Sequence, residues 1–209
     1  MTSSNITALL PCPDKKGQVD VYADGELVLT LSEDAVFEAG LRVGDMLNEQ
    51  RLCEIEYTVT LTKAKAKAYG YLSYGDLSAS ALCKKLTRYG FSQEIAQAVC
   101  EDLSAAGYID DARYALAFAG YLAGTKLYGP RRILQELYAK GVDRQTSEQA
   151  LYELDADFES NIKTLVAGKF SFDRNDRKQA SKAIASLVRY GYDYDMISEA
   201  VGSLEDDYE

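Results

Sequence analysis

Apolar positions recur along the chain in three copies of one pattern. The copies cover residues 78–103, 129–154 and 178–204, and in each an apolar stripe with a period of about 3.6 residues leads to a glycine. The three glycines are Gly90, Gly141 and Gly191. A leucine stands one helical turn before each of them and an apolar residue directly after it, which is the arrangement that ends a helix. Each copy therefore predicts a helix, a glycine stop and a second helix.

A further helical segment precedes each copy, at residues 62–73, 110–123 and 157–167. The fold class predicted is mainly α, with nine helices in three tandem three-helix repeats at residues 61–106, 107–155 and 156–209. The third repeat ends in an acidic tail, Glu205 to Glu209. One helix pair cannot bury its own apolar face, so we expect neighbouring repeats to stack into an elongated, curved body. The alternative is a compact bundle whose repeated stripes are only core.

Residues 1–60 follow a different pattern and predict a small N-terminal β-rich region. Apolar residues alternate from Val19 to Leu31 around Asp24-Gly25, which predicts a hairpin, and residues 6–10 predict a third strand. Ser32, followed by two acids, predicts the start of a short helix. A sheet this small is a marginal domain by itself, so we expect it to lean on the first helical repeat.

The composition, with 47% apolar and 27% charged residues, is that of an ordinary soluble protein. The first residues have neither the basic start nor the apolar run of a signal peptide, so we expect the protein to stay in the cytoplasm. The cysteines show no metal-ligand spacing, and we expect them to be reduced core residues. They are Cys12, Cys53, Cys83 and Cys100.

The net charge of −10 argues against a protein that simply coats nucleic acid. It hides a basic band, because residues 1–60 carry −7, residues 61–140 carry +4 and residues 141–209 carry −7. The cations of the band are Lys63, Lys65, Lys67, Lys84, Lys85, Arg88, Arg113, Lys126, Arg131, Arg132 and Lys140. A solvated helix surface explains most single lysines. Arg131 and Arg132, however, open a helix and oppose its dipole, which indicates another reason for their presence.

The sequence offers little catalytic chemistry. It contains no histidine, which removes the commonest general base and metal ligand, and it has no phosphate-binding glycine motif. Adjacent acids such as Asp110 and Asp111 do not face each other on a helix, and Asp110 is best interpreted as an N-cap. We therefore expect a protein that is not an enzyme and that needs no cofactor and no metal.

Two central segments, GYIDDARYA at 107–115 and KLYGPRRILQELYAKGV at 126–142, closely resemble the signature of the RecX family of bacterial RecA regulators. Residues 71–91 and 187–197 resemble the first and last repeats of that family. The resemblance covers residues 62–204. One departure is Tyr74-Gly75-Asp76, where the family usually carries an arginine. Together with the acidity of the chain, this departure argues against strong direct affinity for DNA.

The resemblance implies a protein that binds RecA filaments, with DNA inside them, and that modulates recombination, repair and the SOS response, usually by inhibition. It implies no small-molecule substrate, and because no stretch reaches 18 consecutive apolar residues, we expect no membrane contact. The candidate partner-binding residues are Arg113, Arg131, Arg132, Lys140, Lys84, Lys85 and Arg88. The candidate structural residues of the motif are Asp110, Asp111, Gly90, Gly129, Gly141 and Gly191. The alternative is a helical-repeat module that binds nucleic acid without RecA.

Overall fold

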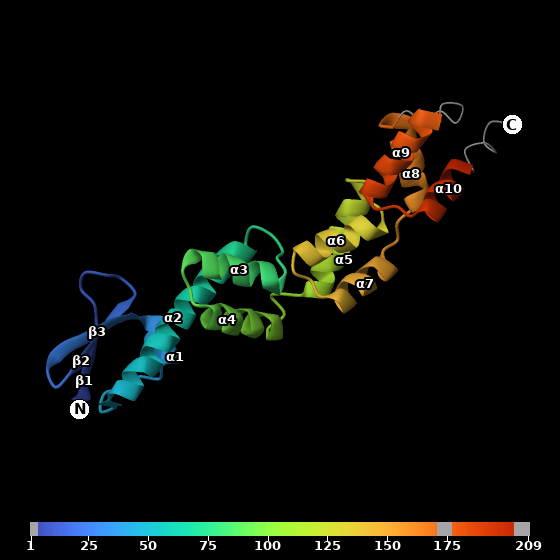
Figure 1. Ribbon diagram of the computed structural model, residues 1–209. Coiled ribbons are helices and arrows are strands. Elements are labelled where there is room, and N and C mark those ends of the chain that lie inside the picture. Colours follow the sequence, from blue (N-terminus) through green and yellow to red (C-terminus); the bar gives the residue numbers. More distant parts are fainter. Residues whose placement is uncertain (1–3, 171–176, 203–209) are drawn as a thin grey trace. The chain divides into compact units, whose positions relative to one another are not determined.

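The computed structural model describes residues 4–170 and 177–202 of the chain, which divides into two compact units (Figure 1). The first unit comprises residues 1–75 and 82–103. The second comprises residues 76–81 and 104–209.

The first unit begins with a four-stranded antiparallel sheet in the order β3-β2-β1-β4. Its strands are β1 (Ser4–Pro11), β2 (Gln18–Ala23), β3 (Glu26–Ser32) and β4 (Met46–Leu47). The predicted hairpin and third strand are confirmed. Asp24 and Gly25 both take positive φ values, 50° and 88°, as a tight hairpin turn with the right-handed twist of its strands requires. β4 was missed, because two residues are too few to show an alternating pattern.

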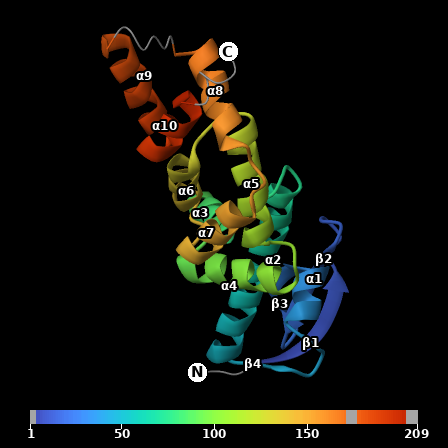
Figure 2. The ribbon, with the colours of Figure 1, turned by 90° about the vertical axis from the view of Figure 1, so that its right-hand side faces the viewer.

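Two helices cover one face of this sheet (Figure 2). The first is α1 (Glu33–Glu38), whose N-terminus is capped by the Ser32 side chain as predicted. The second is α2 (Glu49–Leu72), which begins well before the predicted residue 62, so that the expected boundary at residue 60 falls inside one continuous helix. Ile55, in its first half, is buried in the same cluster as Val21 and Leu31 of the sheet, and this cluster is the core of the β-rich region.

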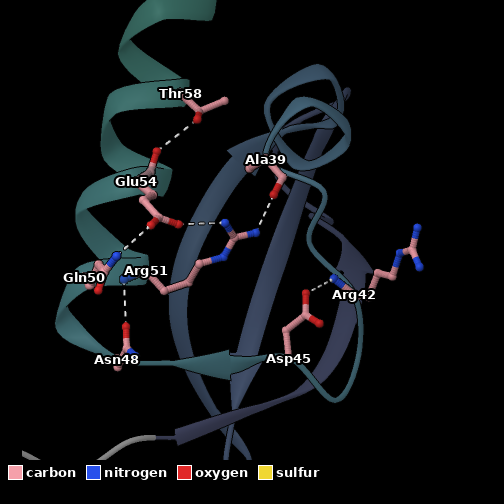
Figure 3. A network of polar contacts seen from close by, with 8 residues as sticks. All are labelled: Ala39, Arg42, Asp45, Asn48, Gln50, Arg51, Glu54 and Thr58. Atoms are coloured by element: carbon pink, nitrogen blue, oxygen red, sulfur yellow. Dashed lines mark hydrogen bonds and ion pairs between the residues drawn. The ribbon is translucent and has the colours of Figure 1, made fainter.

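Arg51 ties the start of α2 to the segment that follows α1 (Figure 3). Its guanidinium donates to the Ala39 carbonyl oxygen at 2.6 Å and to a Glu54 carboxylate oxygen at 2.9 Å. The hydrogen bond from Arg51 to the Glu54 carboxylate lowers the pKa of Glu54. Asn48 caps the helix by accepting from the Arg51 backbone N–H at 2.8 Å. The start of α2 is thus capped by Asn48, and it also supplies a hydrogen-bond donor to the Ala39 carbonyl at the end of α1.

We expect Arg51→Met to destabilise the first unit by about 1–2 kcal/mol, because the Ala39 carbonyl loses a charged donor while the aliphatic stem is largely kept. Amide hydrogen exchange would show the loss as faster exchange in α1 and at the start of α2. Gln50→Met is the matched control, since Gln50 bonds only the exposed Glu54. Equal exchange in both variants would contradict the role given to Arg51.

Together with α2, the helices after it fall into the three predicted three-helix sets. They are α2, α3 (Ala79–Tyr89) and α4 (Gln93–Ala105); α5 (Asp111–Gly124), α6 (Pro130–Ala139) and α7 (Arg144–Glu153); and α8 (Phe158–Gly168), α9 (Arg177–Tyr190) and α10 (Tyr194–Gly202). Gly90, Gly141 and Gly191 take positive φ values of 118°, 79° and 97°. The mainly α fold with three-helix repeats and a β-rich start is confirmed. The stacking of the repeats stays a prediction, and Leu204 and the acidic tail lie outside the described residues.

The cysteines are free thiols, but they do not all belong to the core. Cys100 is buried and Cys83 is half-buried on the stripes where they were expected. The prediction was wrong for Cys53, which is exposed on α2, and Cys12 is only half-buried in the connection after β1. Within residues 4–170 and 177–202, no helix is long and apolar enough to cross a membrane.

Candidate partner-binding surfaces

The second and third repeats meet at a backbone crossing between Gly129 and Gly191. The Gly129 N–H donates to the Tyr190 carbonyl at 2.8 Å, and the Arg131 N–H donates to the Gly191 carbonyl at 3.1 Å. A Cβ on Gly129 would stand 2.6 Å from the Gly191 carbonyl atoms, and one on Gly191 would stand 2.3 Å from the Arg132 nitrogen. Both positions therefore require glycine for close approach, and Gly191 requires it also for the helix stop that the sequence predicts, because its φ is positive.

Tyr192 strengthens this crossing. Its ring is fully buried, and its hydroxyl donates to the Leu127 carbonyl at 2.9 Å in the loop before α6. Burial raises the pKa of the Tyr192 hydroxyl well above its usual value. A second link joins the same repeats, since the Asn161 side-chain amide donates to the Ala123 carbonyl at 3.0 Å.

Arg131 and Arg132 have internal partners at this crossing. Arg131 Nε lies 2.5 Å from Asp193 Oδ1 without the alignment of a hydrogen bond, and the arginine side chain remains 67% exposed. Arg132 donates to Glu136 through Nε at 2.9 Å and lies over the Tyr128 ring at 5.5 Å. These ion pairs are a structural reason for cations at the start of α6, where they oppose the helix dipole. The exposed parts of the Arg131 and Arg132 side chains remain accessible to a partner.

Asp110 and Asp111 hold neighbouring segments of the second unit. Asp110 caps α5 by accepting from the Arg113 N–H at 2.9 Å. Asp111 accepts from the Ala79 N–H at 2.8 Å, and so satisfies the first turn of α3. Arg113 itself is exposed and pairs loosely with Asp76 at 3.8 Å.

Lys140 is the C-cap of α6, directly before the Gly141 stop. Its carbonyl accepts from the buried Ser78 hydroxyl at 2.6 Å, which joins the segment before α3 to the end of α6. Its ammonium group lies 5.5 Å from the centre of the Phe118 ring. The backbone role is structural, and the exposed side chain keeps a positive charge beside an aromatic ring.

Lys84, Lys85 and Arg88 lie on the exposed side of α3 in the first unit, and none of them forms an ion pair with another described residue. Lys85 joins a basic-aromatic cluster that the sequence analysis missed, formed by Lys67, Tyr71, Lys85 and Tyr89. The Lys67 nitrogen lies 4.2 Å from the centre of the Tyr89 ring, and Lys67 and Lys85 both lie about 5 Å from that of Tyr71. The tyrosine four residues after each lysine was the available signal.

The ion pair of Lys65 and Asp102 joins α2, which carries Lys67 and Tyr71 of this cluster, to α4. Lys65 Nζ on α2 lies 3.0 Å from Asp102 on α4, and this hydrogen bond raises the pKa of Lys65. The pair fixes the Lys65 side chain, whereas Lys84 and Arg88 are exposed and form no ion pair with another described residue. Uncompensated cations beside aromatic rings can bind acidic protein surface, phosphate or bases. Within the described residues, no group of three or more histidine, cysteine or acidic side chains could hold a metal ion.

Comparison with known proteins shows two matches to family models. Residues 64–103 match the first three-helix domain of RecX, and residues 110–151 match the second. The regulatory protein RecX of Clostridioides difficile strain 630 is 30% identical over 190 residues, covering 90% of this chain and 89% of that protein.

Solved structures give the same result. A crystal structure titled regulatory protein RecX superposes with a TM-score of 0.79 at 26% identity, covering 94% of this chain and 99% of the other. The crystal structure of RecX from Lactobacillus salivarius gives a TM-score of 0.62 at 26% identity, covering 70% of this chain and 97% of the other. Because the similarity extends over nearly the whole length of a relative at 30% identity, the chain belongs to the RecX family of regulatory proteins.

Proposed function

We propose that this protein regulates a RecA-type recombinase by binding RecA nucleoprotein filaments, most simply as an inhibitor of their activity. It acts in the cytoplasm on recombination, repair and the SOS response, and it acts by binding rather than by catalysis. The observation that carries this proposal is the 30% sequence identity to the regulatory protein RecX of Clostridioides difficile, which extends over 89% of that protein.

The charge distribution supports a binding role. Residues 61–140 carry +4 between two segments of −7, so cations gather on the helices of the first two repeats. Such a band can contact acidic surface or DNA phosphate within a filament, while the acidic segments disfavour binding to free DNA. Steering of this kind weakens with salt.

The test of this function is RecA-driven ATP turnover on single-stranded DNA. We expect the purified full chain to slow this turnover when it is present at far less than one molecule per RecA. Unchanged turnover at equimolar protein would contradict the proposal. The same assay distinguishes inhibition from stimulation, because it reports the sign of the effect.

Within the proposed contact set, Lys84 and Arg88 are the most informative residues, because Arg131 and Arg132 already have acidic partners whose loss would perturb the fold. We expect Lys84→Glu with Arg88→Glu to weaken inhibition about tenfold, since two attractive charges become repulsive. The measurement is the half-inhibitory concentration in the ATP-turnover assay.

The matched control is Lys182→Glu with Arg189→Glu, on the equivalent face of α9. It makes the same change in net charge in the third repeat, where no contact is proposed. Equal inhibition by both double variants would contradict a contact through α3 and would leave net charge as the cause.

The basic-aromatic cluster favours the second candidate, a module that binds nucleic acid without RecA. Tyrosine rings beside lysines are a stacking surface for single-stranded bases next to cations for phosphate. Tight binding of bare single-stranded DNA, with a steep salt dependence and no effect of added RecA, would favour this candidate.

A further inference from the structure

Exposed apolar side chains other than tyrosine gather in the small N-terminal region. Among the residues that the structure describes, they are Leu10, Leu27, Val28, Phe37, Val43 and Met46, with Leu116 as the exception elsewhere. Leu10 and Leu27 are 51% and 54% exposed on β1 and β3. Exposed apolar side chains on the strands of a small sheet are available for contact with a partner.

β3 is an edge strand of that sheet. Alternate residues of an antiparallel edge strand turn their N–H and C=O groups away from the neighbouring strand. Apart from its pairing with β2, β3 makes no backbone hydrogen bond to another described part of the chain within Glu26–Leu31. The outer edge of β3 therefore presents a row of donors and acceptors. At the opposite side of the sheet, β4 is only two residues long.

β3 lacks most of the devices that protect an edge. From Leu27 to Ser32 it contains no charged residue and no proline, and a bulge at Val28 is the one irregularity. Natural edge strands usually carry lysine, proline or a cover against pairing with other chains. An edge of this kind is suited to accept an added strand.

The charged residues around β3 indicate which kind of partner can bind its outer edge. Asp24 precedes β3, Glu26 is its first residue, and Glu33 and Asp34 follow it; all four are exposed. Lys15 and Lys16, in the turn before β2, reduce the charge near Glu33, so the Asp24 end is the more acidic. Two copies paired through β3 would bring together two regions of −7 each, which disfavours a second copy as the occupant.

We propose that the outer edge of β3 binds an extended segment of a partner protein, with alternating apolar residues and with lysine or arginine at its ends, as an additional β-strand. Main-chain hydrogen bonds hold the segment, Leu27 and Val28 contact its apolar side chains, and the flanking acids contact its basic ends. This surface lies on the sheet and does not depend on the proposed RecA contact through α3.

The test uses the full chain and two synthetic peptides, KKVTVTVKK and its acidic counterpart EEVTVTVEE. We expect the basic peptide to bind at least about tenfold more tightly at low salt, and to slow amide exchange within β3 while exchange in α5–α7 is unchanged. Equal binding of the two peptides, or protection away from β3, would overturn the proposal. RecA-driven ATP turnover is measured separately, and its result leaves this one unaffected.

Charge-exchanged variants make the test specific. Glu26→Lys with Glu33→Lys should reverse the preference toward the acidic peptide, and Glu26→Lys alone should reduce it if the double variant is poorly folded. Glu56→Lys with Glu101→Lys, at exposed sites on α2 and α4, changes the net charge equally and should keep the preference for the basic peptide. Sedimentation of the chain alone as a dimer that Val28→Lys dissociates would overturn the proposal in favour of a second copy.

Discussion

Gly191→Ala is expected to destabilise the second unit by about 2–5 kcal/mol. Two effects add at this position. Gly191 has a φ of +97°, which an L side chain adopts only at a cost, and its new Cβ would stand 2.3 Å from the Arg132 nitrogen. The Arg132 backbone cannot give way, because its N–H and that of Ile133 both donate to the Gly129 carbonyl at the start of α6.

Two other alanine variants separate these effects. Gly90→Ala has a φ of +118° but nothing within 4 Å of the new Cβ, so it carries only the backbone cost of about 1–2 kcal/mol. Gly129→Ala has an ordinary φ of −80°, so it carries only the clash with Gly191, about 1–3 kcal/mol. Hydrogen exchange read separately in the two units measures all three. A Gly191→Ala effect no larger than that of Gly90→Ala would contradict the crossing of the two repeats.

Tyr192→Ala is the second large effect, and we expect a loss of about 3–5 kcal/mol in the second unit. The ring is fully buried beside Phe158, with ring centres 6.4 Å apart, and its removal leaves a cavity. Tyr192→Phe keeps the ring but leaves the Leu127 carbonyl without its donor, at a cost of about 1–3 kcal/mol. Chemical denaturation, monitored by amide hydrogen exchange in α8–α10, measures the loss of stability in both variants. A Tyr192→Phe variant as unstable as Tyr192→Ala would show that the hydroxyl matters more than the packing.

The same tyrosine predicts a pH dependence. Its pKa is raised in the folded protein, whereas an exposed tyrosine in the unfolded chain titrates near about 10. The stability that Tyr192 contributes is therefore complete below pH ~10 and is lost as the pH rises from there toward the folded pKa. Since other groups titrate in this range, the informative quantity is the difference in unfolding free energy between wild type and Tyr192→Phe. That difference should shrink above pH ~10, and a constant difference would contradict the prediction.

The sequence by itself determined the local features of this protein. The glycine stops, the Asp110 and Ser32 caps, the Asp24-Gly25 turn and the three-helix sets each depend on residues within one or two helical turns, or on two adjacent strands. Features of this range are visible in the sequence as residue spacing and residue type, so they could be predicted without knowledge of the fold. The family resemblance had the same basis, and the comparisons confirm it.

Only the tertiary structure decided how distant segments meet. The sequence analysis interpreted Arg131 and Arg132 as partner contacts, whereas the structure adds internal roles for both arginines beside Asp193 and Glu136. The crossing of Gly129 and Gly191 and the hydrogen bond from Tyr192 to the Leu127 carbonyl had no local signal. The physical reason is that each depends on backbone approach or ring placement between segments far apart in the chain. Packing fixes such contacts, and a helical period specifies only which face is buried.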